Sequence, residues 1–275
     1  MSSPLAPFLC PPGYAGPTGL RALAREGSAV TEAARLVRRA VTDRVRSGED
    51  SPYDVPADEH GEVPVMLIPG FMAGDATLAL MAAQLRRLGY RTYRSRMHAN
   101  VGCTREASDG IEARLEEIVA ERGRRVSIVG HSLGGLLARG LAVRRPDLVE
   151  AIVTLASPIL APGATHPVLL FDLSVVLRLR EAGFGAMMGA DCTSGECARL
   201  SWERAQAPIA HDVAFTSVFS RRDGLIDWRS CLDPQAKTVE VTTSHIGMAI
   251  DPGVMDVVAR ALSDNRARHA RRRPA

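Results

Sequence analysis

Short apolar runs alternate with amphipathic segments from residue 63 onward, and this alternation constrains the fold more than any other feature of the sequence. The runs predict buried strands, because they are short and end at Gly, Pro or polar residues. They span residues 63–68, 90–94, 125–129, 151–156, 213–219 and 238–243. Helical spacing of apolar residues marks the segments 75–88, 107–122, 132–143 and 253–262. Such alternation predicts an α/β fold, with helices covering both faces of a mostly parallel sheet.

The alternation stops once, and this interruption defines the expected domain organisation. We predict one α/β domain over residues 51–265, with a segment inserted at 159–208. Residues 1–50 begin with a Pro/Gly-rich stretch and continue with helical spacing, so an N-terminal helical appendage is expected. Residues 266–275 form an Arg-rich tail.

Charge is distributed unevenly along the 275 residues, whose net charge is +3. Residues 266–275 contain five arginines and no acid, and residues 1–50 contain seven arginines against five acids, which leaves residues 51–265 with a net charge of −4. The basic ends therefore say little about what the domain binds. Aromatic residues make up only 4% of the chain, so a nucleic-acid-binding surface of interleaved basic and aromatic residues is not expected.

The sequence shows no membrane-spanning run and no recognisable signal peptide. No uncharged apolar stretch approaches the roughly 20 residues that a spanning helix needs. The first 20 residues lack a cationic start and are interrupted by five prolines. We therefore expect a soluble, cytoplasmic protein.

Five cysteines are too few for a disulfide-rich scaffold in a chain of this length. Cys192 and Cys197 are close enough for a local disulfide, although ordinary buried thiols are the alternative. Their C-x4-C spacing has no second pair, so it is poor evidence for zinc.

The motif Gly130-His131-Ser132-Leu133-Gly134 carries the strongest chemical signal. It fits G-x-S-x-G and lies where a predicted strand meets a predicted helix, which is the context of a nucleophile elbow. The glycines leave room for a tight, strained turn that exposes the serine hydroxyl at the carboxyl edge of the sheet. Ser132 is therefore the candidate nucleophile.

A serine hydroxyl needs a base, and His245 is the candidate. In folds of this type the partners follow in the order serine, acid, histidine. His245 follows the strand predicted at 238–243, so it lies on a loop at the same sheet edge as Ser132. The other histidines after Ser132 are less suitable. His166 is in the inserted segment, His211 precedes a strand, and His269 is in the charged tail.

Asp223 is the candidate acid that orients this base. It lies four residues past the strand predicted at 213–219 and precedes Gly224, which suits a turn toward an imidazole. Asp227 is the competitor, although capping a turn or short helix is the role that we expect for it.

Acyl transfer also needs donors for the developing oxyanion. The backbone N–H of Leu133, directly after the nucleophile, is one candidate. The other is the N–H of Phe71, in the Gly-containing loop after the first core strand. A simple strand-to-helix turn is the alternative reading of that loop.

These stretches together resemble the α/β-hydrolase superfamily, specifically bacterial esterases and lipases related to triacylglycerol lipases. The matching stretches are 65–71, 130–135, 154–158, 220–228 and 244–248. The chain has Pro69-Gly70 where such lipases often have His-Gly. The resemblance implies a Ser132–Asp223–His245 triad that hydrolyses carboxylic esters through an acyl-enzyme. No cofactor or metal is expected, because the nucleophile, the base and the oxyanion donors suffice.

The inserted segment, 159–208, occupies the position of the lid in such enzymes. It contains an apolar stretch, 168–179, which predicts either a movable cap over an acyl pocket or a permanently packed helix.

The expected partner is a small-molecule or lipid ester, with transient lipid contact through this segment and no nucleic acid. Thioesterases, amidases and acyltransferases share the triad and are the alternative. A non-catalytic binding protein would be expected to lack part of it. Acyl-chain length and oligomeric state are not specified by the sequence.

Overall fold

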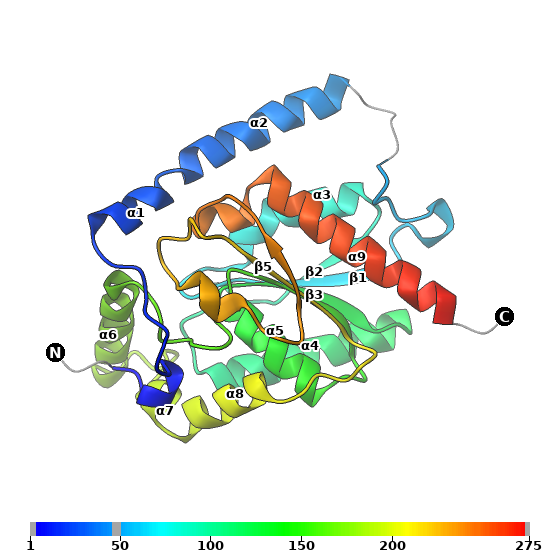
Figure 1. Ribbon diagram of the computed structural model, residues 1–275. Helices are drawn as coiled ribbons and strands as arrows, with labels where there is room; N and C mark the ends of the chain where they lie inside the picture. The colour runs from blue at the N-terminus through cyan, green and yellow to red at the C-terminus, as the bar shows by residue number, and fades with distance from the viewer. Residues whose placement is uncertain (1–3, 46–50, 273–275) are drawn as a thin grey trace.

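A single parallel sheet of six strands forms the centre of the protein in a computed structural model, which describes residues 4–45 and 51–272 (Figure 1). The strand order is β2-β1-β3-β4-β5-β6, and every neighbouring pair is parallel. The strands are β1 Pro64–Ile68, β2 Arg91–Arg94, β3 Val126–His131, β4 Val149–Leu155, β5 Ala214–Phe219 and β6 Lys237–Glu240. Each begins within two residues of its predicted start, so the predicted α/β class and sheet are confirmed.

Helices cover both faces of this sheet (Figure 1). The α-helices are α1 Leu20–Glu26, α2 Ala29–Val45, α3 Ala79–Arg87, α4 Thr104–Arg122, α5 Leu133–Arg144, α6 Pro167–Glu181, α7 Asp191–Ser194, α8 Glu196–Gln206 and α9 Pro252–Arg272. Short 3-10 helices are η1 Pro7–Leu9, η2 Ala57–Glu59, η3 Asp75–Leu78, η4 Trp228–Cys231 and η5 Ile246–Ala249. Together with the sheet they form the three layers expected of an α/β fold.

The two faces of β1 show how the sequence builds these layers. Successive side chains of a strand point to opposite faces. Val65 and Leu67 pack in a buried cluster with residues of α3 and α9, whereas Met66 and Ile68 pack in another with residues of α4 and α5. Since both faces are covered, all five residues of β1 are buried.

The inserted segment lies between β4 and β5 and folds into α6, α7 and α8. Helix α8 contacts α5 and α4, so the segment packs on the α4–α5 side of the sheet. A third small apolar cluster, formed by Leu173, Val176 and Met188, holds its interior together.

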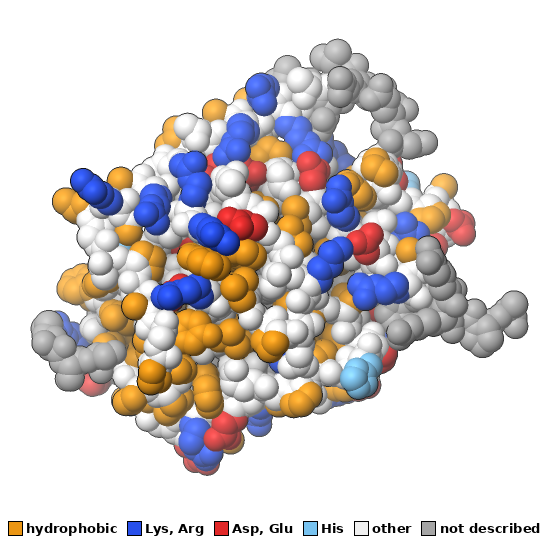
Figure 2. Space-filling view, viewed as in Figure 1, with side chains coloured by type: hydrophobic (Ala, Val, Ile, Leu, Met, Phe, Trp, Pro, Cys, Tyr) orange, Lys and Arg blue, Asp and Glu red, His pale blue; other side chains and the backbone are white. Residues whose placement is uncertain are grey.

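The N-terminal helices α1 and α2 lie outside α9, on the other side of the molecule (Figure 1). An ion pair joins Arg39 of α2 to Asp256 of α9 at 2.7 Å. Basic side chains are spread over the surface of these N-terminal helices, whereas apolar side chains gather on the lower half of the face in view (Figure 2).

Among the described residues, no helix is both long enough and apolar enough to span a membrane.

Two elements have C-terminal ends that lie three or more residues from the predicted ones. The strand predicted at 238–243 ends at Glu240, because its neighbour β5 ends at the paired residue Phe219. The helix predicted at 253–262 continues to Arg272, since no Gly or Pro interrupts it before Pro274. Most of the Arg-rich tail is therefore helical, and residues 273–275 lie outside the described residues.

Candidate active site

Ser132 lies in a strained turn between β3 and α5. Its backbone has φ 51° and ψ −119°, a conformation that costs energy for any residue with a side chain and persists at functional sites. The two glycines of the motif make this turn possible. A Cβ on Gly134 would lie 2.3 Å from the carbonyl oxygen of Ile68, and one on Gly130 would lie 2.6 Å from Cα of Gly135. The turn places Ser132 at the carboxyl edge of the sheet.

Asp223 and His245 meet at the same edge of the sheet and are both buried. Oδ2 of Asp223 lies 2.7 Å from Nδ1 of His245. The other oxygen, Oδ1, accepts hydrogen bonds from the backbone N–H groups of Leu225 and Ile226, both at 2.8 Å. The carboxylate is thus held by its own loop with one oxygen toward the imidazole. An ionised carboxylate only accepts, so Nδ1 donates and Nε2 is left free to act as a base.

The electrostatic surroundings shift the pKa values of the two histidines of the site in opposite directions. Burial lowers the pKa of His245, but the charge of Asp223, its hydrogen bond and the charge of Glu26 outweigh burial, so this pKa is raised above 6.5. Burial and the nearby His245 lower the pKa of His131 to about 3. His131 is therefore neutral, and its Nε2–H donates to the backbone oxygen of His245 at 3.1 Å.

Ser132 directly follows His131, whose ring contacts that of His245. The rings of His131 and His245 lie 4.9 Å apart, and Ser132 is the next residue in the chain. Within the described ranges, Ser132 Oγ makes no hydrogen bond to His245. Such bonds are often long before substrate binds, so this geometry does not count against a serine–histidine pair.

The loop after β1 carries Phe71, the second candidate oxyanion donor. Asn100, which is buried, holds this loop: its Nδ2 donates to the Pro69 oxygen at 2.9 Å, and its backbone oxygen accepts from Met72 N–H at 3.1 Å. Met72 adopts a positive φ of 59°, which is uncommon for a side chain of this size. In the part of the chain that the structure describes, neither Phe71 nor Leu133 donates its N–H to another backbone group outside regular elements.

The competing residues have other partners. Asp227 caps η4 by accepting from Arg229 N–H and also binds the Arg229 side chain. His166 caps the start of α6 by accepting from Val168 N–H. His211 precedes β5 and so lies at the opposite sheet edge, and the side chain of His269 lies outside the described residues.

Two acidic residues of the N-terminal helices contact the site, and no sequence pattern predicted them. Glu26 of α1 accepts from the backbone N–H groups of Gly224 (2.8 Å), His245 (3.1 Å) and Ile246 (3.0 Å). Glu32 of α2 accepts from the N–H and the hydroxyl of Ser244 at 2.9 and 2.7 Å. The available signal was weak: these are the two acids among residues 20–41, and nothing in that pattern identifies a partner.

An apolar cavity opens beside Ser132 and follows α5. Its α5 wall contains Leu133, Leu136, Leu137, Gly140, Leu141 and Arg144. Leu169, Leu170 and Leu173 of α6 and Trp202 of α8 face it from the inserted segment. The inserted segment therefore forms part of the wall of a cavity that suits an apolar group attached at Ser132.

Metal-ligand residues do not gather around Ser132 within the described residues. The described residues contain one group of three such side chains. It consists of Cys103, Cys192 and Cys197 and includes neither Asp223 nor His245.

A family model described as "PGAP1-like alpha/beta domain" matches residues 111–179, which include the Ser132 turn and the start of the inserted segment. No curated protein sequence matches the chain.

Solved structures of lipases share the fold. The mature lipase BlEst2 of Bacillus licheniformis is similar to this chain with a TM-score of 0.58 and 15% identity, over 78% of this chain and 96% of the lipase. The monoacylglycerol lipase of Paleococcus ferrophilus has a TM-score of 0.52 and 16% identity, over 74% and 96%. A soluble variant of the monoglyceride lipase of Saccharomyces cerevisiae has a TM-score of 0.53 and 13% identity, over 78% and 89%. The chain therefore has the α/β-hydrolase fold, as the sequence predicted.

Proposed function

We propose that this chain, an α/β-hydrolase by its fold, is a serine hydrolase that cleaves carboxylic esters through Ser132, His245 and Asp223. The observation that carries the proposal is the buried Asp223–His245 pair, with 2.7 Å between Oδ2 and Nδ1, next to a strained serine turn that opens into an apolar cavity. Three groups with these roles form the acyl-transfer arrangement that recurs on unrelated folds.

The reaction begins when Ser132 Oγ passes its proton to Nε2 of His245 and attacks the ester carbonyl carbon. The carbonyl oxygen becomes an anion, which accepts hydrogen bonds from the N–H groups of Phe71 and Leu133. Asp223 stabilises the imidazolium and keeps its ring oriented. When the tetrahedral intermediate collapses, the alcohol leaves with the proton from His245 and an acyl-Ser132 ester remains.

Water completes the cycle in the same geometry. His245 removes a proton from water, the hydroxide attacks the acyl carbon, and Ser132 Oγ regains the proton as the carboxylic acid departs. The neutral His131 supports this step indirectly, because its Nε2–H holds the backbone oxygen of His245 without adding a competing charge. No further group is needed for the chemistry as proposed.

The cavity supports an acyl group as its occupant, since its walls on α5 and α6 are mainly leucines. The inserted segment also exposes Phe171, Val175 and Phe184, with exposed fractions of 65%, 38% and 58%. We include a lipid ester in the proposed substrate class for this reason, with the inserted segment approaching the lipid surface.

A fluorophosphonate probe tests the proposal directly, because it labels activated serines. We expect labelling of Ser132 by mass spectrometry, and loss of both labelling and p-nitrophenyl butyrate hydrolysis in Ser132→Ala. Ser263→Ala, on α9, serves as the matched control and should keep both. Labelling at another residue, or full activity of Ser132→Ala, would refute the proposal.

A substrate panel separates ester hydrolysis from the other reactions that the same residues support. Ester, thioester and amide substrates with one common acyl group are compared, with and without an alcohol acceptor. We expect the ester to be hydrolysed fastest. A preference for the thioester, the amide or the alcohol would instead identify a thioesterase, an amidase or an acyltransferase.

A further inference from the structure

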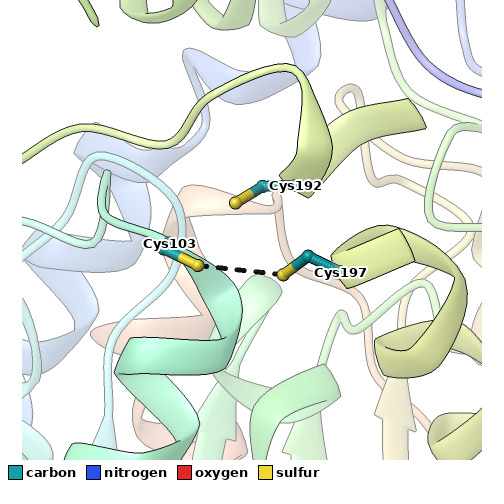
Figure 3. Close-up of side chains that lie close together, drawn as sticks. All are labelled: Cys103, Cys192 and Cys197. Atoms are coloured by element: carbon teal, nitrogen blue, oxygen red, sulfur yellow. Dashed lines mark hydrogen bonds between the residues drawn. The ribbon is translucent and has the colours of Figure 1, made fainter. Parts of the chain in front are cut away.

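Three cysteines from distant parts of the chain converge on one point beside the cavity. Cys103 directly precedes α4, Cys192 lies on α7 and Cys197 lies on α8. Their Sγ atoms all lie within 4.8 Å of one another, and those of Cys103 and Cys197 are 3.8 Å apart. The three sulfurs point toward a common centre (Figure 3). All three are free thiols.

We propose that Cys103, Cys192 and Cys197 form a three-thiolate binding site for a thiophilic d10 cation, with Zn²⁺ as its representative. Zinc binds thiolate sulfur at about 2.3 Å in tetrahedral geometry, so two sulfurs on one ion lie about 3.8 Å apart. The Cys103–Cys197 separation has this value. A disulfide would instead require the two sulfurs about 2 Å apart.

The surroundings leave room for a fourth ligand. Cys103 and Cys192 are partly exposed, so water can reach an ion between the sulfurs, whereas Cys197 is buried. Thr104 Oγ1 lies 3.3 Å from the sulfur of Cys197. Among the described residues, no histidine or carboxylate joins the cluster. We therefore assign the fourth position to water.

Cys103 and Cys192 differ in how readily they lose a proton. Burial raises the pKa of Cys103, but hydrogen bonds from Glu106 N–H, from the Cys192 thiol and from Arg105 N–H outweigh burial, so this pKa lies below its ordinary value. Burial and the hydrogen bond to Cys103 raise the pKa of Cys192 to about 12. A bound cation would displace that proton to solvent, as thiolate ligation requires.

The site would connect the inserted segment to the body of the protein. Cys192 and Thr104 line the apolar cavity, and α7 and α8 form part of its wall. An ion held by α4, α7 and α8 would therefore fix that wall against the α4–α5 layer. Metal binding itself depends on the sulfur geometry alone, so it can be tested whether or not the protein hydrolyses esters.

Cobalt titration of the full-length, reduced and chelator-treated protein tests the site. We expect one Co²⁺ per chain, with the thiolate-to-cobalt charge-transfer absorption and intense visible bands of tetrahedral coordination. Zn²⁺ should abolish these bands by displacing Co²⁺. Each of Cys103→Ser, Cys192→Ser and Cys197→Ser should weaken binding at least tenfold, whereas Cys10→Ser, at an exposed cysteine, should leave it unchanged.

Thermal melting and thiol reactivity provide readouts that do not depend on the folding of one variant. A hundredfold excess of Zn²⁺ over its Kd should raise the Tm of the wild-type protein by about 5 °C. It should also protect Cys103 and Cys192, the two partly exposed thiols of the site, from alkylation until a chelator is added.

The proposal is overturned by any of three results. These are absence of the cobalt bands in the wild-type protein, retention of the bands in Cys103→Ser, or a disulfide among these three cysteines in protein purified without reductant. Peptide mass spectrometry under non-reducing conditions detects the last.

Discussion

The carboxylate of Glu26 accepts a hydrogen bond from the backbone N–H of His245 at 3.1 Å, across 219 positions of the sequence. The same carboxylate binds the N–H of Gly224, next to Asp223. One side chain of α1 thus holds both loops of the proposed acid–base pair. The contact is close: a Cβ on Gly224 would lie 2.1 Å from the backbone oxygen of Ala22.

Replacing this carboxylate should impair catalysis without removing a reacting group. We expect Glu26→Gln to lower kcat by about tenfold to a hundredfold with little change in KM, because small misplacements of catalytic groups are costly. Since the charge of Glu26 raises the pKa of His245, the acid limb of the kcat/KM profile should also move to lower pH. Steady-state kinetics across pH measure both effects. Asp58→Asn, at an exposed acid, is the control. An unchanged profile would contradict a positioning role.

Activity should depend on the deprotonation of His245. Its pKa is raised, so we expect the acid limb of kcat/KM to have its midpoint above 6.5. Asp223→Asn removes the charge that raises this pKa, so the limb should shift downward while kcat falls about 10⁴-fold. A pH profile of each enzyme measures the shift. An acid limb below the ordinary histidine value in the wild-type enzyme would argue against this base.

The two histidines of the site should titrate differently. We expect the His131 ring to stay neutral from about pH 8 to about pH 5, because its pKa is lowered to about 3, whereas His245 should gain its proton in this range. NMR of the histidine Cε1 protons follows both rings, with His131→Asn to assign the signals. A His131 signal that titrates near 6.5 would contradict the neutral role.

Filling the cavity at Gly140 should select against long acyl chains. Gly140 lines the cavity eight positions after Ser132 on α5, about 12 Å along the helix. A Cβ there meets no atom within 4 Å, so Gly140→Leu should fold normally. We expect at least tenfold lower kcat/KM for p-nitrophenyl laurate and little change for the butyrate.

The matched control for this variant is Gly110→Leu. Gly110 is exposed on α4, outside the cavity lining, and also has open space around its Cβ position. Both variants gain the same helix propensity. A similar loss for both esters in Gly140→Leu would mean that the acyl chain lies elsewhere.

The buried ion pair of Arg139 and Asp233 should be critical for stability. Arg139 is fully buried and its Nε donates to Asp233 at 3.0 Å, while its two terminal nitrogens have no hydrogen-bond partner among the described residues. Asp233→Asn leaves this charge uncompensated and should destabilise the protein by about 3–5 kcal/mol, measured by urea denaturation. Arg139→Met combined with Asp233→Asn should recover part of the loss. Asp264→Asn, which breaks the exposed pair with Lys237, should cost less than about 1 kcal/mol.

Much of the sheet and the serine turn was predictable because both depend on neighbouring residues. The apolar run that became β1 and the Gly130–Gly134 motif are local patterns, and the structure places strand, turn and helix where those patterns predict them. The predicted C-terminal end of α9 was wrong, because the arginines that suggested a tail are also good helix formers. The roles of Ser132, Asp223 and His245 stay predictions until the variants are measured.

The sequence by itself determined the strand–helix order and the chain order of the three candidate catalytic residues, since periodicity and short motifs act within a few positions. Only the tertiary structure decided that Glu26 reaches His245, that Asn100 holds the Pro69 loop, and that Cys103 joins Cys192 and Cys197. Each of these contacts joins segments that are far apart in the sequence, and their meeting depends on how the layers pack around the sheet. No local sequence pattern specifies such contacts between distant segments.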